Sequence, residues 1–366
     1  MIVGVPREVK VQEYRVALTP EGVIEFIKNG HTVLIEKSAG LGSSISDQDY
    51  IQAGATIIDS VDKLWQESDL ILKVKEPIES EYSRMRQGQI LFTYLHLAAS
   101  KACTDALIKS KTTSIAYETV EVDGALPLLV PMSEVAGRMA TQVGADALLK
   151  PKGGRGVLLA GVPGVSPGKV VVIGGGIAGL NAAVIALGMG ADVTVLDRSA
   201  KRLAHIDQIY GGRMKTLMSS TASIQKSIYD ADLVIGAVLI PGAKAPKLVT
   251  NQDIAKMKPG SVLVDIAIDQ GGCFEDSKPT THENPTYSVH NSVFYCVANM
   301  PGAVPVTSTY ALTNVTLPFA IQIANQGWEK ALKANPDLAK GLNTHDGKVT
   351  YKAVADAHGY EFSPVL

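Results

Sequence analysis

Short apolar runs alternate with amphipathic stretches through the first 118 residues of the chain. The amphipathic stretches predict helices, because Thr19 and Pro20 supply an N-cap followed by a proline at the first helical position. Ser46 and Asp49 form a pattern typical of a capping box, and Ser100 begins a further helix. The apolar runs predict strands over residues 2–5, 33–35, 70–74, 90–95 and 114–117.

The second half of the chain repeats this alternation after a glycine- and proline-rich stretch at 151–168, which we interpret as a domain boundary. Residues 132–149 have helical spacing and connect the two halves. The apolar stretch 177–191 is too short and too glycine-rich to span a membrane, so it predicts a buried helix. After Pro305 the pattern is helical through Ile323 and ends in a polar tail. The strands predicted here are 169–173, 192–196, 233–237, 261–268 and 293–297.

Strands that alternate with helices are typical of a parallel, doubly wound sheet with right-handed crossovers. The 366 residues, of which 46% are hydrophobic and 19% charged, suffice for two such domains. We therefore expect an α/β protein with two doubly wound domains.

Net charge and cysteine content indicate which partners and which cellular compartment to expect. A net charge of −2 gives no general reason to bind nucleic acid or anionic lipid. Cys103, Cys273 and Cys296 form neither a disulfide framework nor a CxxC metal pair, which favours the reducing cytosol. The first residues become charged at Arg7 without an apolar core, so no secretory signal is expected. We expect a cytoplasmic protein that binds neither nucleic acid nor membrane and uses no metal.

A glycine loop carries the strongest chemical signal. Gly174, Gly176 and Gly179 form GxGxxG directly after a β-branched run and directly before a helix-forming run. In a dinucleotide site these glycines allow a tight turn, close approach of the pyrophosphate, and packing of helix on strand. Asp197 ends the next predicted strand, where a carboxylate binds the adenosine ribose and repels a 2′-phosphate. NAD is therefore favoured over NADP, a preference that the adjacent Arg198 could weaken; the alternative is a glycine turn beside a surface aspartate.

Other catalytic and phosphate motifs fail in this sequence. VSPGKV resembles the end of a P-loop, but Pro163 and Val170 occupy positions that require Gly and Ser or Thr. An HExxH zinc helix does not occur either.

Polar residues at predicted strand ends are the candidates for substrate chemistry, because ligands of open α/β sheets bind there. Lys73 and Lys75 share one face by the period of two, with Lys75 at the carboxyl end of the strand that Pro77 terminates. We favour Lys75 as a substrate contact over a solvated edge lysine. His96 follows the strand of QILFTYLHL and is a second candidate, against the alternative of a buried, satisfied histidine.

Two further strand ends carry charged residues. In VLVDIAIDQGG, Asp265 and Asp269 share a face and Asp269 stands at the strand end, where it could act as a base or orient a water. A turn or capping aspartate is the alternative. Arg15 lies between the first strand and the first helix, where a guanidinium could bind a carboxylate bidentately, unless it is a surface charge. One Arg, one Lys, one His and one Asp form a coherent set for dehydrogenation of an amino or hydroxy acid.

With these residues in place, the chain resembles the alanine dehydrogenase family over essentially its full length. The resemblance is carried by GVPREVKVQEYRVALTPEGV, VIGGGIAGLNAAVIALGMGADVTVLD, LKVKEP, TYLHLA, PMSEVAGRMA, GAVLIPGAKAPKLV and VDIAIDQGGCFE. The chain is also similar, more distantly, to the NAD-binding subunit of proton-translocating transhydrogenase. It departs from the family at Gln12, where Asn is common, and at Arg202, where relatives often carry Lys near the ribose.

The resemblance implies reversible oxidative deamination of L-alanine to pyruvate and ammonium with NAD. Arg15 would bind the substrate carboxylate and Lys75 the carbonyl or carbinolamine oxygen. His96 would hydrogen-bond the pyruvate and assist proton transfer, and Asp269 would handle the protons of water and ammonia. The remaining substrate-binding residues, which would shape the methyl pocket, are Tyr94 and Met132.

The same resemblance implies a Rossmann dinucleotide-binding domain at 129–306 and a Rossmann-like substrate domain from 1–128 and 307–366, and typical relatives are homohexamers. The family pattern moves the helix at 132–149 into the nucleotide domain or makes it the connector. The residues expected around the cofactor are Ser133, Gly174, Gly176, Ile177, Ala178, Gly179, Asp197, Arg202, Ser219, Val238, Leu239, Ile266, Ala267, Ile268, Asp269, Val297, Ala298, Asn299 and Met300.

Three other functions are open to a chain of this kind. A transhydrogenase subunit would bind NAD(H) without amino-acid chemistry, and the combination of Arg15, Lys75, His96 and Asp269 favours the enzyme instead. Lysine- or saccharopine-type dehydrogenases of related fold keep the chemistry and change the substrate. A non-catalytic NAD sensor is the third, and nothing in the sequence calls for it.

Overall fold

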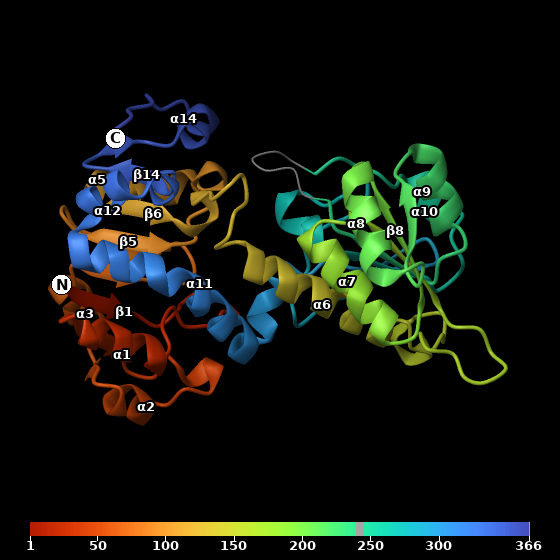
Figure 1. Cartoon of the computed structure of the whole chain (residues 1–366), viewed down its shortest axis with the longest axis horizontal. Coiled ribbons are helices and arrows are strands. Elements are labelled where there is room, and N and C mark those ends of the chain that lie inside the picture. Colours follow the sequence, from red (N-terminus) through yellow and green to blue (C-terminus); the bar gives the residue numbers. More distant parts are fainter. Residues whose placement is uncertain (239–244, 366) are drawn as a thin grey trace. The chain divides into compact units, whose positions relative to one another are not determined.

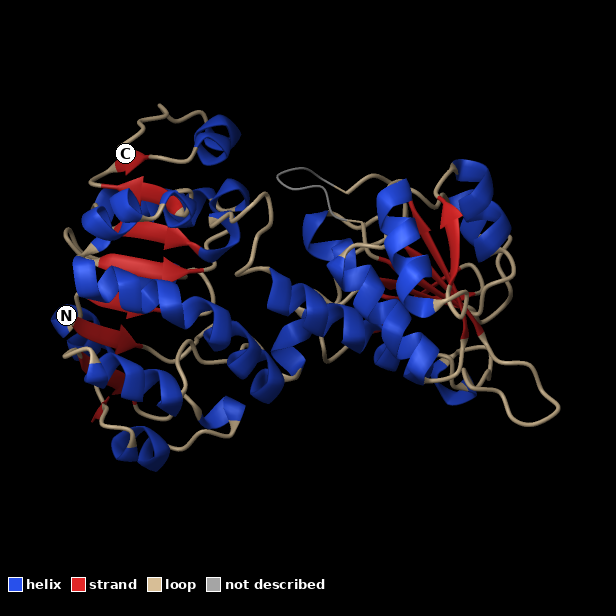
Figure 2. Ribbon diagram, in the orientation of Figure 1, coloured by secondary structure: helices blue, strands red, loops and turns tan. Residues whose placement is uncertain are grey.

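The computed structural model describes residues 1–238 and 245–365, so Leu239 lies outside the described residues. The described chain forms two compact units, one of Met1–Met132 with Gly302–Leu366 and one of Ser133–Pro301 (Figure 1). Each unit holds one sheet flanked by helices (Figure 2). The predicted α/β class with two doubly wound sheets is confirmed.

The sheet of the first unit has eight strands in the order β15-β14-β6-β5-β4-β1-β2-β3. Neighbours from β3 through β6 pair in parallel, whereas β14 runs antiparallel to β6 and β15 antiparallel to β14. The strands are β1 (Ile2–Val5), β2 (Thr32–Glu36), β3 (Thr56–Ile58), β4 (Leu70–Leu72), β5 (Ile90–Thr93), β6 (Thr113–Ala116), β14 (Leu342–His345) and β15 (Lys348–Val349).

The helices of the first unit begin where the capping signals predict. Thr19 accepts a hydrogen bond from the Gly22 N–H, the Ser46–Asp49 capping box is present, and Ser100 accepts from the Cys103 N–H. The helices are α1 (Pro20–Lys28), α2 (Asp47–Gln52), α3 (Val61–Glu67), α4 (Glu79–Tyr82), α5 (Lys101–Ser110), α11 (Pro305–Gln326), α12 (Trp328–Ala334), α13 (Pro336–Ala339) and α14 (Lys352–His358).

Apolar side chains from the middle strands fix this unit. Leu34, Ile71 and Leu91 of β2, β4 and β5 pack with Trp65 of α3 and Leu107 of α5, and all five are buried. Burial of side chains of this size contributes about 1.5–3 kcal/mol each, which holds the parallel strands in register.

The sheet of the second unit has seven strands in the order β12-β13-β11-β10-β7-β8-β9, all parallel except the edge strand β12. Val171, Val234, Leu263 and Phe294 from four neighbouring strands form its core with Ile224. The strands are β7 (Lys169–Ile173), β8 (Asp192–Asp197), β9 (Lys215–Met218), β10 (Leu233–Gly236), β11 (Val262–Asp265), β12 (Thr286–Val289) and β13 (Ser292–Tyr295). Its helices are α6 (Val130–Ala147), α7 (Ile177–Gly188), α8 (Ala200–Tyr210), α9 (Thr221–Ile228) and α10 (Asn251–Ile254).

Several predicted strands are too long, and three of them end where the candidate site lies. The run at 70–74 leaves strand geometry after Leu72, and the run at 90–95 does so after Thr93. The run at 261–268 ends as a strand at Asp265 and continues as a 3-10 turn, Ile266–Gln270, because the Asp265 carboxylate accepts the N–H of Ala267 and turns the chain. The glycine- and proline-rich stretch at 151–168 is a loop inside the second unit.

Both sheets share one order of parallel strands. Counted from the edge, β3-β2-β1-β4-β5-β6 in the first unit corresponds to β9-β8-β7-β10-β11-β13 in the second. In each sheet the order reverses beside the first strand, between β1 and β4 in one unit and between β7 and β10 in the other. Ligands of open α/β sheets bind at the carboxyl ends of the strands at such a reversal. Among the described residues, no helix has the length and apolarity needed to cross a membrane.

Candidate functional site

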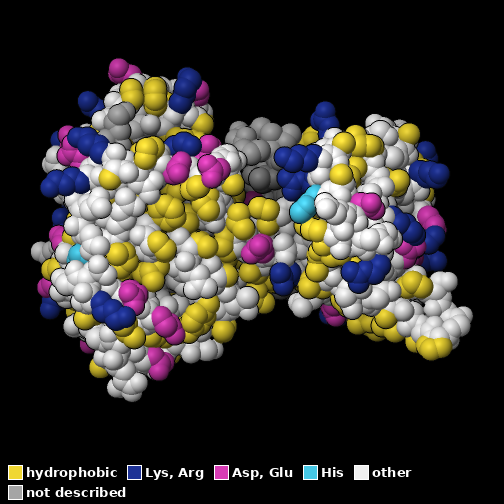
Figure 3. Space-filling model, in the orientation of Figure 1, with side chains coloured by type: hydrophobic (Ala, Val, Ile, Leu, Met, Phe, Trp, Pro, Cys, Tyr) yellow, Lys and Arg dark blue, Asp and Glu magenta, His cyan; other side chains and the backbone are white. Residues whose placement is uncertain are grey.

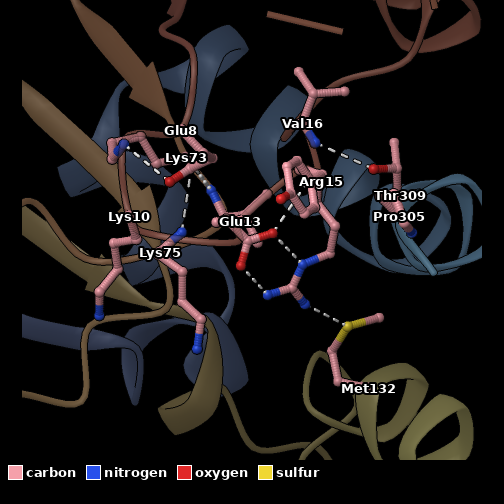
Figure 4. Close-up of polar contacts among 12 residues, drawn as sticks. Glu8, Lys10, Glu13, Arg15, Val16, Lys73, Lys75, Met132, Pro305 and Thr309 are labelled. Carbon is pink, nitrogen blue, oxygen red and sulfur yellow. Dashed lines mark hydrogen bonds and ion pairs between the residues drawn. The ribbon is translucent and has the colours of Figure 1, made fainter. Parts of the chain in front are cut away.

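The reversal point of the first sheet gathers four of the predicted substrate residues within one unit. Arg15 follows β1, Lys75 follows β4, and Tyr94 and His96 follow β5, so all four lie beyond carboxyl ends of neighbouring strands. Figure 4 shows the side chains of Arg15 and Lys75 in the loops after β1 and β4.

Arg15 is buried, with 2% of its surface exposed, so the interpretation as a surface charge is wrong. Its Nε and Nη2 donate to the two carboxylate oxygens of Glu13 at 2.7 and 2.5 Å, and its Nη1 contacts Met132 Sδ at 2.9 Å (Figure 4). Burial alone would lower the pKa of Arg15, but the hydrogen bonds and charge of Glu13 outweigh it and raise that pKa. The guanidinium is therefore a fixed, permanently charged fork.

Lys73 lies one residue beyond β4, not inside a strand as predicted, and it is fully buried. Its Nζ donates to Glu8 at 3.1 Å and forms an ion pair with Glu81 at 3.0 Å. Desolvation would lower the pKa of Lys73, yet the two carboxylates raise it. Lys75 is partly exposed, and its backbone N–H donates to Glu8 at 3.4 Å. The two lysines therefore differ in environment, with Lys73 inside an ion-pair network and Lys75 at its edge.

His96 is exposed, so the alternative of a buried histidine is wrong. It lies three residues past β5 with a left-handed φ of 48°, and its backbone N–H donates to Glu118 at 2.6 Å. Its ring stacks on Tyr94 with centroids 5.9 Å apart. Tyr94 is buried and donates its hydroxyl to the Leu128 carbonyl at 2.5 Å, and burial raises the pKa of that phenol above its usual range. The neutral ring of Tyr94 thus stacks against the exposed imidazole of His96.

The glycine loop of the second unit has the geometry of a dinucleotide turn. Gly174 has a φ of +100°, which favours glycine. A Cβ on Gly179 would lie 1.7 Å from the Gly174 carbonyl oxygen, so only glycine lets α7 start this close to β7. A Cβ on Gly176 would meet nothing within 4 Å, which leaves the N-terminus of α7 at Ile177 and Ala178 open for a pyrophosphate.

Asp197 ends β8 beside this turn. Its carboxylate accepts the N–H of Gly175 at 2.7 Å and that of Ser199 at 2.8 Å. Arg202, on α8, donates from Nη1 to the Gly175 carbonyl at 3.2 Å. The predicted aspartate and the predicted arginine therefore both contact the glycine turn.

Asp265 and Asp269 do not share a strand face, because the 3-10 turn separates them. Asp265 is buried and accepts from the N–H groups of Ala267, Cys273 and Phe274 and from the Ser277 hydroxyl. Burial raises the pKa of Asp265, against the lowering effect of these hydrogen bonds. Asp269 lies on the turn and is exposed. Asp265 is thus the residue that shapes the turn, and Asp269 the one that solvent and ligands can reach.

The other predicted cofactor residues follow the carboxyl ends of strands in the same unit, apart from Ser133 in the first turns of α6. Ser219 follows β9 and Val238 follows β10. Ile266, Ala267 and Ile268 follow β11, and Val297, Ala298, Asn299 and Met300 follow β13.

Three carboxylates that organise the candidate site were missed at the level of sequence: Glu8, Glu13 and Glu118. Glu13 stands two residues before Arg15, and Glu8 lies in the same polar loop. Acidic residues in a loop rich in lysine and arginine could have indicated ion pairs. Spacing in the sequence does not show, however, which carboxylate binds which cation.

Comparison with known proteins identifies similar chains. The N-terminal domain model of alanine dehydrogenase/PNT matches residues 4–136, and the C-terminal domain model matches residues 140–352. Alanine dehydrogenase of Mycolicibacterium smegmatis is 63% identical over 97% of this chain and 96% of its own. A solved L-alanine dehydrogenase superposes with a TM-score of 0.96 at 49% identity, covering 98% of this chain and 99% of that one. A transhydrogenase from Sinorhizobium meliloti is more distant, with a TM-score of 0.82 at 27% identity and coverage of 96% and 100%.

Proposed function

The chain belongs to the alanine dehydrogenase/PNT family, and from this membership we propose that it is an NAD-dependent L-alanine dehydrogenase. L-Alanine, NAD⁺ and water give pyruvate, ammonium, NADH and a proton, and the reaction is reversible. The observation that carries the proposal is the buried, charged Arg15 after β1, with Lys75 after the neighbouring strand β4, at the reversal point of the first sheet. A protein that only binds nucleotides has no need of a carboxylate receptor there.

Arg15 binds the substrate carboxylate. Glu13 binds Nε and Nη2, and Nη1 contacts Met132 Sδ, the contact that we expect the substrate carboxylate to replace. A thioether is a weak acceptor, so a carboxylate replaces it readily. We assign the contact with the substrate methyl group to Met132 and Tyr94, both of which are buried.

Lys75 and His96 act on the oxygen of pyruvate and of the carbinolamine. An ammonium near that oxygen stabilises the negative charge that develops as ammonia adds. The accessible imidazole of His96 donates a hydrogen bond and transfers a proton, as a general acid–base of this kind does. Asp269, exposed on its turn, takes and returns the protons of water and ammonia.

The glycine turn and its surroundings fit NAD. The open position at Gly176 admits the pyrophosphate to the start of α7, and Asp197 is placed for the ribose hydroxyls. When bound, NAD accepts the hydride from the substrate Cα and returns it in the reverse direction. We assign the nucleotide domain to residues 129–306 and the substrate domain to 1–128 with 307–366.

A solution assay tests the proposal. The purified protein is mixed with NAD and L-alanine, and NADH absorbance is followed. Formation of NADH is expected, and its absence would favour the transhydrogenase-like alternative. Turnover with serine, 2-aminobutyrate and lysine is measured in parallel, and a preference for lysine would refute the substrate. Lys75→Ala and Asp269→Ala should abolish turnover with NADH binding retained, since neither residue holds the pyrophosphate.

We further assign the protein to the cytoplasm and to a homohexamer. The loop at 151–168 exposes Leu158, Val162 and Val165 with 64%, 55% and 63% of their surfaces accessible, and Figure 1 shows it (yellow-green) projecting from its unit. Figure 3 shows further apolar side chains among the charged ones on the surface. Apolar groups gathered at a projecting tip favour self-association. Sedimentation equilibrium gives the mass of the assembly, and a monomer would refute the assignment.

A further inference from the structure

The segment that carries Lys75 leaves the sheet abruptly. On one side of β4, the neighbouring strand β1 ends at Val5, and the last β1–β4 register pair is Gly4 with Ile71. On the other side, Lys73 N still donates to the Phe92 carbonyl at 3.3 Å. The N–H groups just beyond β4 on the β1 side therefore need another acceptor.

The Glu8 carboxylate is that acceptor. Its Oε1 accepts the N–H of Val74 at 2.6 Å and lies 3.4 Å from the N–H of Lys75 (Figure 4). A carboxylate bonded to backbone N–H groups in a dry environment holds them more tightly than a neutral acceptor does. The main chain of Val74 and Lys75 is thereby fixed to the loop after β1.

Lys73 fixes the carboxylate in turn. Its Nζ binds Glu8 Oε2, the oxygen that the backbone does not use, and Glu81 binds the same Nζ from α4. Glu8, Lys73 and Glu81 are exposed by only 8%, 0% and 1%. Burial raises the pKa of Glu8, and the charge of Lys73 and the Val74 N–H act against that rise.

We propose that Glu8 is the positioning residue of Lys75, acting through the backbone at Val74 and Lys75, and that Lys73 locks Glu8 in place. The inference rests on the proposed function, in which Lys75 contacts the substrate oxygen. It separates the roles of two lysines two residues apart, one of which holds the loop while the other meets the substrate.

Kinetics of Glu8→Gln and Glu81→Gln, as full-length proteins, test the proposal. The glutamine at position 8 has an NH2 donor in place of one oxygen, so either Lys73 or the backbone N–H of Val74 faces a donor instead of an acceptor. In this variant we expect kcat/KM for pyruvate to fall about 10- to 100-fold, because small misplacements of a catalytic group have effects of that size. The KM for NADH and the Kd for NADH should stay unchanged.

Glu81→Gln is the matched control. Glu81 holds the other side of Lys73 and the Ile78 N–H, not the backbone of Lys75, so its loss removes a carboxylate from the same network. Thermal stability should fall in both variants, whereas only Glu8→Gln should change pyruvate kinetics. Wild-type kinetics in Glu8→Gln, or equal kinetic losses in both variants, would overturn the proposal. If Glu8→Gln fails to fold, Glu8→Asp, which withdraws the carboxylate by one methylene, takes its place with the same expectations.

Amide hydrogen exchange of the peptide over residues 73–77 gives a readout that needs no turnover. Exchange should accelerate in Glu8→Gln or Glu8→Asp more than in Glu81→Gln, and equal exchange in the wild type and the Glu8 variant would refute the backbone clamp. Inactivity of the wild type toward alanine would instead refute the proposed function, so the two failures are distinguishable.

Discussion

The carboxylate of Asp197 accepts a hydrogen bond from the backbone N–H of Gly175 at 2.7 Å. One acidic side chain at the end of β8 thus contacts the turn to which we assign the pyrophosphate. We assign the adenosine ribose to the same carboxylate, so on this assignment one residue both selects the cofactor and shapes the turn.

Replacing Asp197 by glycine should therefore raise the use of NADP relative to NAD. The change removes the negative charge that repels a 2′-phosphate and leaves Arg198 and Arg202 nearby. We expect the ratio of kcat/KM for NADP to that for NAD to rise by about tenfold or more, since removing a close like charge is worth about 1.4 kcal/mol or more. Steady-state kinetics with both cofactors measure it, and an unchanged ratio would locate specificity elsewhere.

Gly176→Ala should weaken NAD binding without disturbing the fold. An added Cβ meets no protein atom within 4 Å, but it would occupy the space to which we assign the pyrophosphate. Gly188→Ala is the control, because its Cβ also meets nothing within 4 Å and it lies at the far end of the same helix. Calorimetric titration with NADH should show weaker binding for the first variant only. Equal affinities would contradict the assignment of the cofactor to this turn.

Arg15→Met should cost both stability and activity. The variant leaves the Glu13 carboxylate buried without its cation, and breaking a buried pair in this way costs about 3–5 kcal/mol. The double variant Arg15→Met with Glu13→Gln should regain part of this free energy of unfolding but no turnover, because the carboxylate receptor is still missing. Urea unfolding and pyruvate kinetics measure the two effects. Recovery of activity in the double variant would remove Arg15 from substrate binding.

Asp230 should give a pH-dependent contribution to stability. Hydrogen bonds from Lys169 and Lys258 lower the pKa of this carboxyl from 3.8 to about 2. A pKa depressed by folding contributes stability that is present above pH 3.8 and is lost as the pH falls toward 2. Because the group is largely exposed, Asp230→Asn should cost only about 0.2–1 kcal/mol at neutral pH. Urea unfolding of both proteins between neutral pH and pH 3 should show the difference shrinking; a constant difference would contradict the ion pair.

Much of the fold could be predicted because buried parallel strands are continuous apolar runs. Residues 2–5 and 169–173 were predicted to the residue. The strands that escaped prediction lie at or near sheet edges, as β3, β9, β12, β14 and β15 do, and sequences such as KTLM and LNTH lack a clear apolar pattern. Their pairing is decided by neighbours distant in the chain, as when Leu342 pairs with Ile115.

The parts of the candidate site that depend on residues close together in the sequence could be predicted. The parts that depend on contacts between residues far apart in the sequence could not. The glycine turn, Asp197 and the strand-end position of Arg15 follow from short-range spacing. The strand extensions to Val74 and Ile268 failed because side-chain carboxylates, Glu8 and Asp265, bind backbone N–H groups and end the strands early. No local rule indicates that a glutamate at position 8 meets the backbone at 74.

Strand β14, which pairs with β6 from the far end of the chain, makes the first unit discontinuous. During synthesis the ribosome releases β1 to β6 first, then all of the second unit, and only at the end the strand that covers the open β6 edge. The second unit is complete earlier, although it starts later. A nascent chain therefore holds an unfinished sheet through most of its translation, and a message truncated before residue 342 would leave that edge exposed to other chains.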